Sequence, residues 1–268
     1  MKSRLYRMAV GLVLPVLLLL AWEWGVRRGA VSPMFFPAPT TIGEALSRMA
    51  STGRLAEDLA ATLSRVSAGL LVGVGAGLPL GLLMGWRDSA RAFLDPTIAA
   101  THALPKIAVY PVLMILLGID DASRVALVAL GAFYPMLVNA MAGVRQIDPR
   151  FFEIARSYGA GKKRVLTEVI WPGSLPFLLS GLRLALNGAL LLGIAAELLT
   201  AKQGLGGTIW MSWQTFRTED LYAVLFVTGL MGVAFNGLTE LLTRVLVPWK
   251  GREANGEGRG VFFAGRGQ

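Results

Sequence analysis

Residues 66–86 read VSAGLLVGVGAGLPLGLLMGW and contain no charged side chain. The hydrocarbon core of a bilayer is about 30 Å thick, so a helix needs about 20 consecutive apolar residues to cross it. The segment meets that length, whereas a soluble core would spread its apolar residues with a period of 3.6 or 2. This stretch therefore predicts a transmembrane helix.

Glycine recurs every fourth residue in this segment, at Gly69, Gly73, Gly77, Gly81 and Gly85. Each step of four advances about 40° around a helix, so the five glycines form one slowly winding stripe. Such a stripe lets a second helix approach closely, as in the small-xxx-small packing of membrane helices. A nucleotide-binding loop would need a preceding strand and polar surroundings, and the segment has neither. We predict that the stripe packs against another helix.

Other apolar blocks extend this prediction along the chain. Four are long enough to span, at residues 8–26, 124–144, 176–199 and 221–247. A sixth, 97–118, is interrupted by prolines and a lysine; we count it as a broken span facing a pathway, because broken helices are tolerated where protein or a cavity encloses them. Whether it is continuous is left open. We expect kinks at the prolines inside spans, which are Pro79, Pro111 and Pro135.

The composition agrees with a membrane protein. Hydrophobic residues make up 54% of the 268 residues and charged ones only 16%, against roughly 25% charged in soluble domains. The absence of cysteine and the single histidine, His102, exclude a disulfide framework and a thiolate or histidine-cluster metal site. We predict an all-α, polytopic integral membrane protein of about six transmembrane helices.

The charge distribution predicts the orientation. Segments 1–7, 87–91, 145–164 and 250–266 carry fifteen of the lysines and arginines, against seven in the loops on the other side. Because cytoplasmic loops are enriched in lysine and arginine, both termini are expected in the cytoplasm. The same distribution argues against nucleic-acid binding, despite the net charge of +9.

The domain organisation follows from these spans. The basic start of the chain lacks a small-residue cleavage site, so the first span is interpreted as a signal anchor and not a cleaved signal peptide. We predict a signal-anchor span and first outer loop (1–61), a transmembrane core (62–249) and a disordered cytoplasmic tail (250–268).

Some polar residues fall at membrane depth, where exposure to lipid is costly. Interhelical hydrogen bonding and contact with a solute are both open for the asparagines. The candidates for a solute pathway are His102, Lys106, Asn139, Asn187 and Glu197.

The longest inner loop, 145–173, reads RQIDPRFFEIARSYGAGKKRVLTEVIWPG. Pro149 can open a helix, and Gly159 and Gly161 break it before a second helical stretch, Lys162–Ile170. The first helix has an apolar face made by Phe151, Phe152, Ile154, Ala155 and Tyr158. Such a helix can dock into a partner's groove or lie on the inner leaflet, held by nearby lysines, and physical chemistry alone does not choose.

This loop resembles the EAA loop of ABC importer permeases, whose pattern is E-A-A, three residues, G, nine residues, I, one residue, L-P. The spacing is carried by Glu153, Ala155, Gly159, Val169, Trp171 and Pro172. Ile154 and Trp171 depart from the usual residues without altering the spacing. Over residues 37–249, segments such as PAPTTIGEAL and AAELLTAKQGLGGTIW are similar to permeases of the nitrate, sulfonate and taurine group.

The resemblance implies a type I ABC importer permease fold in a bacterial inner (plasma) membrane. It implies a permease homodimer, a cytoplasmic ATPase dimer that binds ATP and Mg, and a periplasmic or lipid-anchored solute-binding protein. Its solute would be a small anion, though which one the sequence does not tell. It also implies that Phe152–Tyr158 is the coupling helix, in which Glu153 and Arg156 contact the ATPase, Ala155 allows close approach and Gly159 permits the turn.

We expect no catalytic residue and no cofactor in this chain. The phosphate-binding pattern G-x-x-x-x-G-K-[ST] is absent from the sequence, and Gly161, Lys162 and Lys163 imitate only its end. The alternative is an ion-gradient-driven secondary transporter, which would need a membrane carboxylate relay, for which only Glu197 and Glu240 are candidates. A noncatalytic scaffold would explain the docking helix but not the polar interior.

Overall fold

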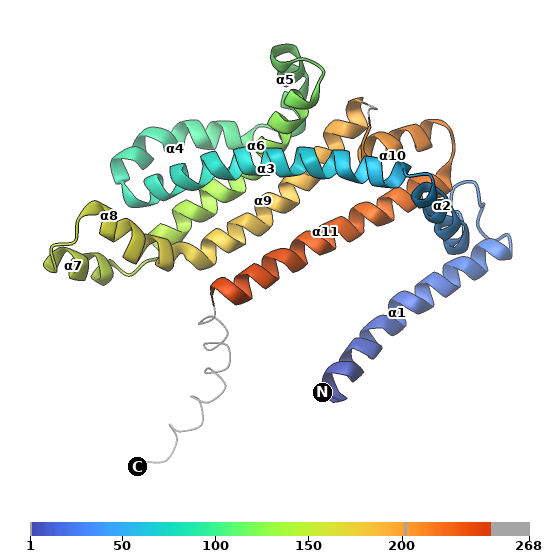
Figure 1. The fold of residues 1–268 in the computed structure, drawn as a ribbon, viewed down its shortest axis with the longest axis horizontal. Coiled ribbons are helices and arrows are strands. Elements are labelled where there is room, and N and C mark those ends of the chain that lie inside the picture. Colours follow the sequence, from blue (N-terminus) through green and yellow to red (C-terminus); the bar gives the residue numbers. More distant parts are fainter. Residues whose placement is uncertain (1, 201–202, 248–268) are drawn as a thin grey trace. The chain divides into compact units, whose positions relative to one another are not determined.

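The computed structural model describes residues 2–200 and 203–247, so the predicted tail 250–268 lies outside them. Every regular element in those ranges is helical (Figure 1), which confirms the all-α prediction. The elements are α1 (Lys2–Arg27), α2 (Pro39–Ser51), α3 (Arg54–Trp86), α4 (Asp88–Ala103), the 3-10 turn η1 (Lys106–Val109), α5 (Tyr110–Leu117), α6 (Asp121–Arg145), α7 (Pro149–Ser157), α8 (Lys162–Val165), the π-helical turn η2 (Leu166–Ile170), α9 (Trp171–Thr200), α10 (Leu205–Gln214) and α11 (Thr218–Leu246).

Four helical segments within the described ranges are long and apolar enough to cross a membrane: α3, α6, Lys162–Thr200 and α11. The pair formed by α4 and Lys106–Leu117 brings the number to five if it counts as one span. The helix α1 covers the predicted first span and has 26 residues, but it is not among these five. A polytopic membrane protein is therefore confirmed, and the number six stays a prediction.

The third predicted span is not continuous. Its two halves are bent by 89° at the break, where Leu104 is extended with ψ 134°. A proline disfavours helical conformation in the residue before it, so Pro105 explains why α4 stops here. The expected kink at Pro111 is wrong, because Pro111 lies in the first turn of α5, where a missing N–H costs no hydrogen bond.

Two segments that lie between predicted spans contain helices. The long first loop, 27–61, holds α2 and the beginning of α3, and the segment 200–220 holds α10. The helix α3 has 33 residues and is therefore about 50 Å long, well beyond the bilayer core. Hydropathy indicates only the part of a helix that lipid surrounds, so it does not predict these polar extensions.

The chain divides into two compact units, and α3, α9 and α11 contribute to both. The first comprises residues up to Leu63 together with Ile194–Leu230, and the second comprises Ser64–Gly193 together with residues from Met231 onward.

The second unit is built on a tight seam between α3 and α6, where the glycine stripe of α3 lies. A Cβ atom added to Gly77 would lie 2.6 Å from the carbonyl oxygen of Phe133, and one added to Gly85 would lie 2.8 Å from that of Met141. Gly75, outside the stripe, has nothing within 4 Å. Buried residues of α3, α6, α8, η2 and α9 then form one apolar core, with Val128, Ala132, Met136 and Ile170 among its members.

The first unit is held by buried carboxylates at the start of α10. Both carboxylate oxygens of Glu197 accept from the Thr62 hydroxyl, at 3.0 and 2.9 Å, and one also accepts from the Gly206 N–H at 3.0 Å. Asp58 accepts from the Gly204 N–H at 3.0 Å and from the Thr208 hydroxyl at 2.6 Å. The carboxylates thus satisfy backbone donors that every helix leaves unpaired at its start.

Candidate functional site

The helix α7 begins at a well-formed cap after the end of α6. The Asp148 carboxylate accepts a hydrogen bond from the Arg150 N–H at 2.9 Å, and Pro149 occupies the first turn. An acidic N-cap and a proline at the first helical position are both strong helix starts. The prediction that Pro149 opens a helix is confirmed, and α7 starts three residues before the predicted Phe152.

The helix α7 ends in a glycine turn. The Gly159 N–H donates to the Arg156 carbonyl at 2.9 Å, and the Ala160 N–H donates to the Ala155 carbonyl at 2.9 Å. These two bonds form a Schellman motif, which requires a left-handed residue at the position of Gly159. The φ of Gly159 is +68°, so the predicted turn at this residue is present.

The apolar residues of α7 divide between two faces. Phe152 and Ala155 are half-buried and pack, with Ala160, against the core of the second unit. Phe151, Ile154 and Tyr158 are 58%, 54% and 84% exposed. Their spacing of three and four residues places them on one side of the helix, so α7 is anchored on one face and presents an apolar surface on another.

This division changes the role expected for Ala155. The resemblance implied that its small side chain allows close approach to a partner. In the structure it faces the chain's own core, so the close approach it permits is that of α7 to its own bundle. Helical spacing groups apolar residues, but it does not tell which of them face inward.

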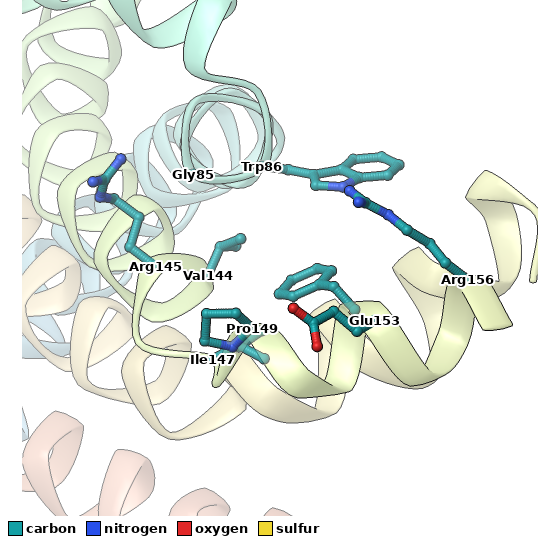
Figure 2. A pocket seen from close by; sticks show the side chains of 9 residues that line it. Gly85, Trp86, Val144, Arg145, Ile147, Pro149, Glu153 and Arg156 are labelled. Carbon is teal, nitrogen blue, oxygen red and sulfur yellow. The ribbon is translucent and has the colours of Figure 1, made fainter.

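Glu153 and Arg156 line a cavity of about 360 Å³ between α7 and the ends of α3 and α6. Figure 2 shows the Arg156 side chain extending toward Trp86 at the end of α3. The Arg87 guanidinium lies 5.2 Å from the centre of the same indole ring, and Arg145 also lines the cavity. The hollow beside α7 is therefore lined by charged side chains of both signs, Glu153, Arg145 and Arg156.

The second half of the loop packs against α7. The stretch predicted as helical, Lys162–Ile170, is present as α8 followed by η2, and α7 contacts η2. Val165 and Ile170 are buried. The remaining motif residues lie at this end of the loop, where Val169 is half-buried and Pro172 is exposed in the first turn of α9.

The structure brings three of the five pathway candidates together. His102 packs edge-on against the Tyr134 ring with centroids 4.9 Å apart, and the Lys106 ammonium lies 5.0 Å from the centre of that ring. Asn139 lines the same cavity as His102 and Tyr134, and its amide donates to the Pro135 carbonyl at 2.8 Å.

The other two candidates lie elsewhere. Asn187 is exposed on α9, and Glu197 is 1% exposed in the first unit, where it holds the start of α10. Sequence reasoning missed Tyr134 and Asp95, which line the cavity with His102. Asp95 precedes His102 by seven residues, which is two helical turns, and that spacing was the only available signal.

Comparisons with known proteins agree with the resemblance. A family model described as binding-protein-dependent transport system inner membrane component matches residues 77–252. The chain is 33% identical over 254 residues to the taurine transport system permease protein TauC of Escherichia coli (strain K12), covering 93% of this chain and 92% of that protein. It is 32% identical over 240 residues to the putative aliphatic sulfonates transport permease protein SsuC of Bacillus subtilis (strain 168), covering 90% and 87%.

Two more distant proteins extend the comparison. The formylaminopyrimidine transport permease protein ThiX of Halalkalibacterium halodurans is 28% identical, with 89% of this chain and 94% of that protein covered. Among solved structures, the inward-facing MetNI methionine ABC transporter has a similar fold, with a TM-score of 0.59, 17% identity, and coverage of 69% of this chain and 93% of that chain.

Proposed function

Because this chain belongs to the family of binding-protein-dependent transport system inner membrane components, and is the permease of an ATP-driven importer, we propose that it carries a small anion of the sulfonate class and is driven through α7. The chain is a multi-pass inner membrane protein that works with an ATPase and a solute-binding protein. The permease works as a homodimer, both termini lie in the cytoplasm, and ATP and Mg bind only to the partner ATPase.

The proposal rests mainly on how α7 is attached to the core of the second unit. ATP binding can drive transport only through contacts that differ between two states of the complex, so the force must pass through a firmly attached element. The inward face of α7, with Phe152 and Ala155, is fixed in the core of the second unit. The exposed face, with Phe151, Ile154 and Tyr158, is available to an ATPase groove.

The cavity beside α7 adds a polar component. Glu153 and Arg156 both line it, so a partner side chain that enters it would meet charges of both signs. Apolar contacts supply affinity and charges select the partner. A helix lying on the inner leaflet would need the same apolar face but would leave this cavity without a ligand.

The proposal is tested by placing a charge on the exposed face. The Ile154→Asp variant should insert normally, lose the copurifying ATPase and lose uptake of radiolabelled taurine or alkanesulfonate by at least about tenfold, because a buried unpaired carboxylate is costly at an interface. Thr167→Asp, an exposed position on η2, is the matched control and should behave as wild type.

Two outcomes would contradict the proposal. If Ile154→Asp keeps its ATPase and its uptake, α7 does not dock there, and membrane-leaflet binding is the better explanation. If uptake persists after ATP is depleted while an ion gradient is maintained, the secondary-transporter alternative is correct.

A further inference from the structure

The first unit contains an apolar groove of about 540 Å³ between α1, α2 and α11. Each helix lines it with residues three or four positions apart, which lie on one side of a helix. No charged residue is among the described residues that line it, so an ionic solute gains nothing there. The lining includes Leu19 and Trp22 of α1, Ile42 and Leu46 of α2, and Tyr222 and Phe226 of α11.

The helix α1 has exposed leucines in several directions. Leu17, Leu18 and Leu20 are all exposed, although successive residues point 100° apart around a helix. A helix that is apolar on all sides is stable in lipid or in a protein core, and here no protein core of the described chain covers these leucines. Lipid chains are therefore the surroundings of α1, and they reach the groove at its side.

The depth of the groove matches one leaflet of a bilayer. Trp22 lies five residues before the end of α1, and Tyr222 lies four residues after the start of α11, which places both about 6–8 Å from the helix ends. Leu19 and Phe226 are eight residues from those ends, or about 12 Å. Half of a hydrocarbon core is about 15 Å thick, so the groove extends over most of the acyl region of one leaflet.

Two aromatic residues mark the shallow part of the groove. The rings of Trp22 and Tyr222 pack edge-on with centroids 5.8 Å apart, at the depth where tryptophan and tyrosine are enriched near lipid headgroups. The Trp22 indole N–H is buried and has no acceptor among the described residues. A buried donor without an acceptor is costly, and a lipid ester carbonyl at this depth supplies an acceptor without adding a donor.

We propose that the groove binds a membrane phospholipid, with one acyl chain beside Leu19, Leu46 and Phe226 and an ester carbonyl accepting from the Trp22 indole N–H. Within a bilayer, hydrophobicity does not favour the groove over bulk lipid, so close packing and this hydrogen bond hold the chain. The headgroup is not selected, because the groove has no charged lining and the start of α2 is already capped by Glu23, which accepts from the Thr40 N–H at 3.1 Å.

This site goes beyond the proposed function and lies largely outside the region shared with the family. The helices α1 and α2 both precede residues 77–252, which the family model matches. The bound lipid would connect these two helices to α11 and so attach them to the permease core.

The test uses the full-length permease complex, purified in detergent, and a phosphatidylcholine with a photoreactive diazirine in the middle of one acyl chain. Labelled peptides are identified by mass spectrometry. Labelling of residues 39–46 and 222–226 should saturate with lipid concentration. Unlabelled phosphatidylethanolamine and phosphatidylglycerol should compete equally, and taurine should not compete.

Gly43→Phe fills the groove, since Gly43 is part of its lining and a Cβ there has nothing within 4 Å. Labelling of both peptides should fall by about tenfold or more. Gly237→Phe is the matched control, because Gly237 is exposed on α11, also has nothing within 4 Å and does not line the groove. It should label as wild type.

Trp22→Phe tests the hydrogen bond, because it keeps an aromatic ring and removes the N–H. Labelling should weaken by about threefold to tenfold, the range for one hydrogen bond. Wild-type labelling of this variant would refute the role of the ester carbonyl.

A Gly43→Cys variant tests whether a second copy of the permease covers the groove instead. The natural chain has no cysteine, so a disulfide-linked permease dimer formed in the membrane would assign the groove to that copy and overturn the proposal. Labelling that does not saturate, that taurine or only one headgroup competes away, or that Gly43→Phe and Gly237→Phe change equally would also overturn it. These measurements need neither ATP nor uptake, so their failure leaves the proposed function intact, and a failure of α7 to dock leaves them interpretable.

Discussion

Glycine is needed for two different reasons in this chain. In the α3–α6 seam it allows close helix packing, and in the turn after α7 it allows a left-handed backbone conformation. In the seam the glycines have helical backbones but no room, since added Cβ atoms would press on the backbone of α6. At the turn Gly159 has open space around it and a φ of +68°. The membrane core is therefore sensitive to volume, whereas the cytoplasmic loop is sensitive to backbone conformation.

The largest effect should come from adding volume to the seam. In a Gly81→Val variant the new Cβ would lie 2.8 Å from that of Ala140 and would collide with the Leu137 carbonyl oxygen. Backbone cannot move aside as a side chain can, so the cost exceeds the ~1–3 kcal/mol of ordinary overpacking. We expect little folded protein in size-exclusion chromatography after detergent extraction.

Gly75→Val is the control for the seam, because this glycine lies on the same helix with nothing within 4 Å. It should yield wild-type amounts of folded protein. If both variants lost folded protein equally, the loss would come from valine anywhere in α3. Close packing in the α3–α6 seam would then not be its cause.

The second effect concerns conformation. Gly159→Val should cost about 1–3 kcal/mol at the turn, because a β-branched residue is strained at positive φ. We expect normal membrane insertion and a loss of uptake. The strain lies in the turn that ends α7, so it changes the position of α7 and leaves the packing of the membrane core intact.

Gly161→Val is its control, because Gly161 has φ −70° and open space, and it should transport normally. The two variants are compared by uptake normalised to the amount of permease in the membrane. Wild-type uptake by Gly159→Val would show that the turn does not position the coupling helix.

The sequence predicted best where one property decides the structure. The seam follows from glycine spacing, the broken third span from Pro105, and α7 from Pro149 and Gly159. In each case a local rule of volume or backbone geometry acts within one or two helical turns, so it can be recognised without knowledge of the neighbours.

The misses have a common physical origin in tertiary packing. The inward orientation of Ala155 depends on where the core lies, and the cavity role of Asp95 depends on which helix faces α4. Glu197 stays a predicted pathway residue, but its contact with the start of α10 could not be predicted, because Thr62, which donates to it, is 135 positions away in sequence. No spacing rule connects residues so distant, and hydropathy does not distinguish a polar residue in a pathway from one that holds a helix end.

The third prediction separates these two roles of Glu197. Glu197→Ala removes the acceptor for the Gly206 N–H and the Thr62 hydroxyl, which costs about 1–3 kcal/mol for buried polar groups. Hydrogen exchange should accelerate in α10 and its start. Glu57→Ala, an exposed acid on α3, should leave exchange there unchanged. If uptake falls while exchange in α10 is unaltered, Glu197 acts on the solute and does not hold the helix.

The smallest effect belongs to the N-cap of α7. Asp148→Ala removes the acceptor for the Arg150 N–H and should destabilise the helix by about 1 kcal/mol. The inward residues Phe152 and Ala155 still anchor α7 in the core, so uptake should fall only slightly while hydrogen exchange in 149–157 rises several-fold. Asp148→Asn retains a side-chain acceptor and should restore wild-type exchange. A loss of uptake as complete as that of Gly159→Val would mean that the cap, and not core packing, fixes α7, and the proposed division between an anchored face and a docking face would have to be abandoned.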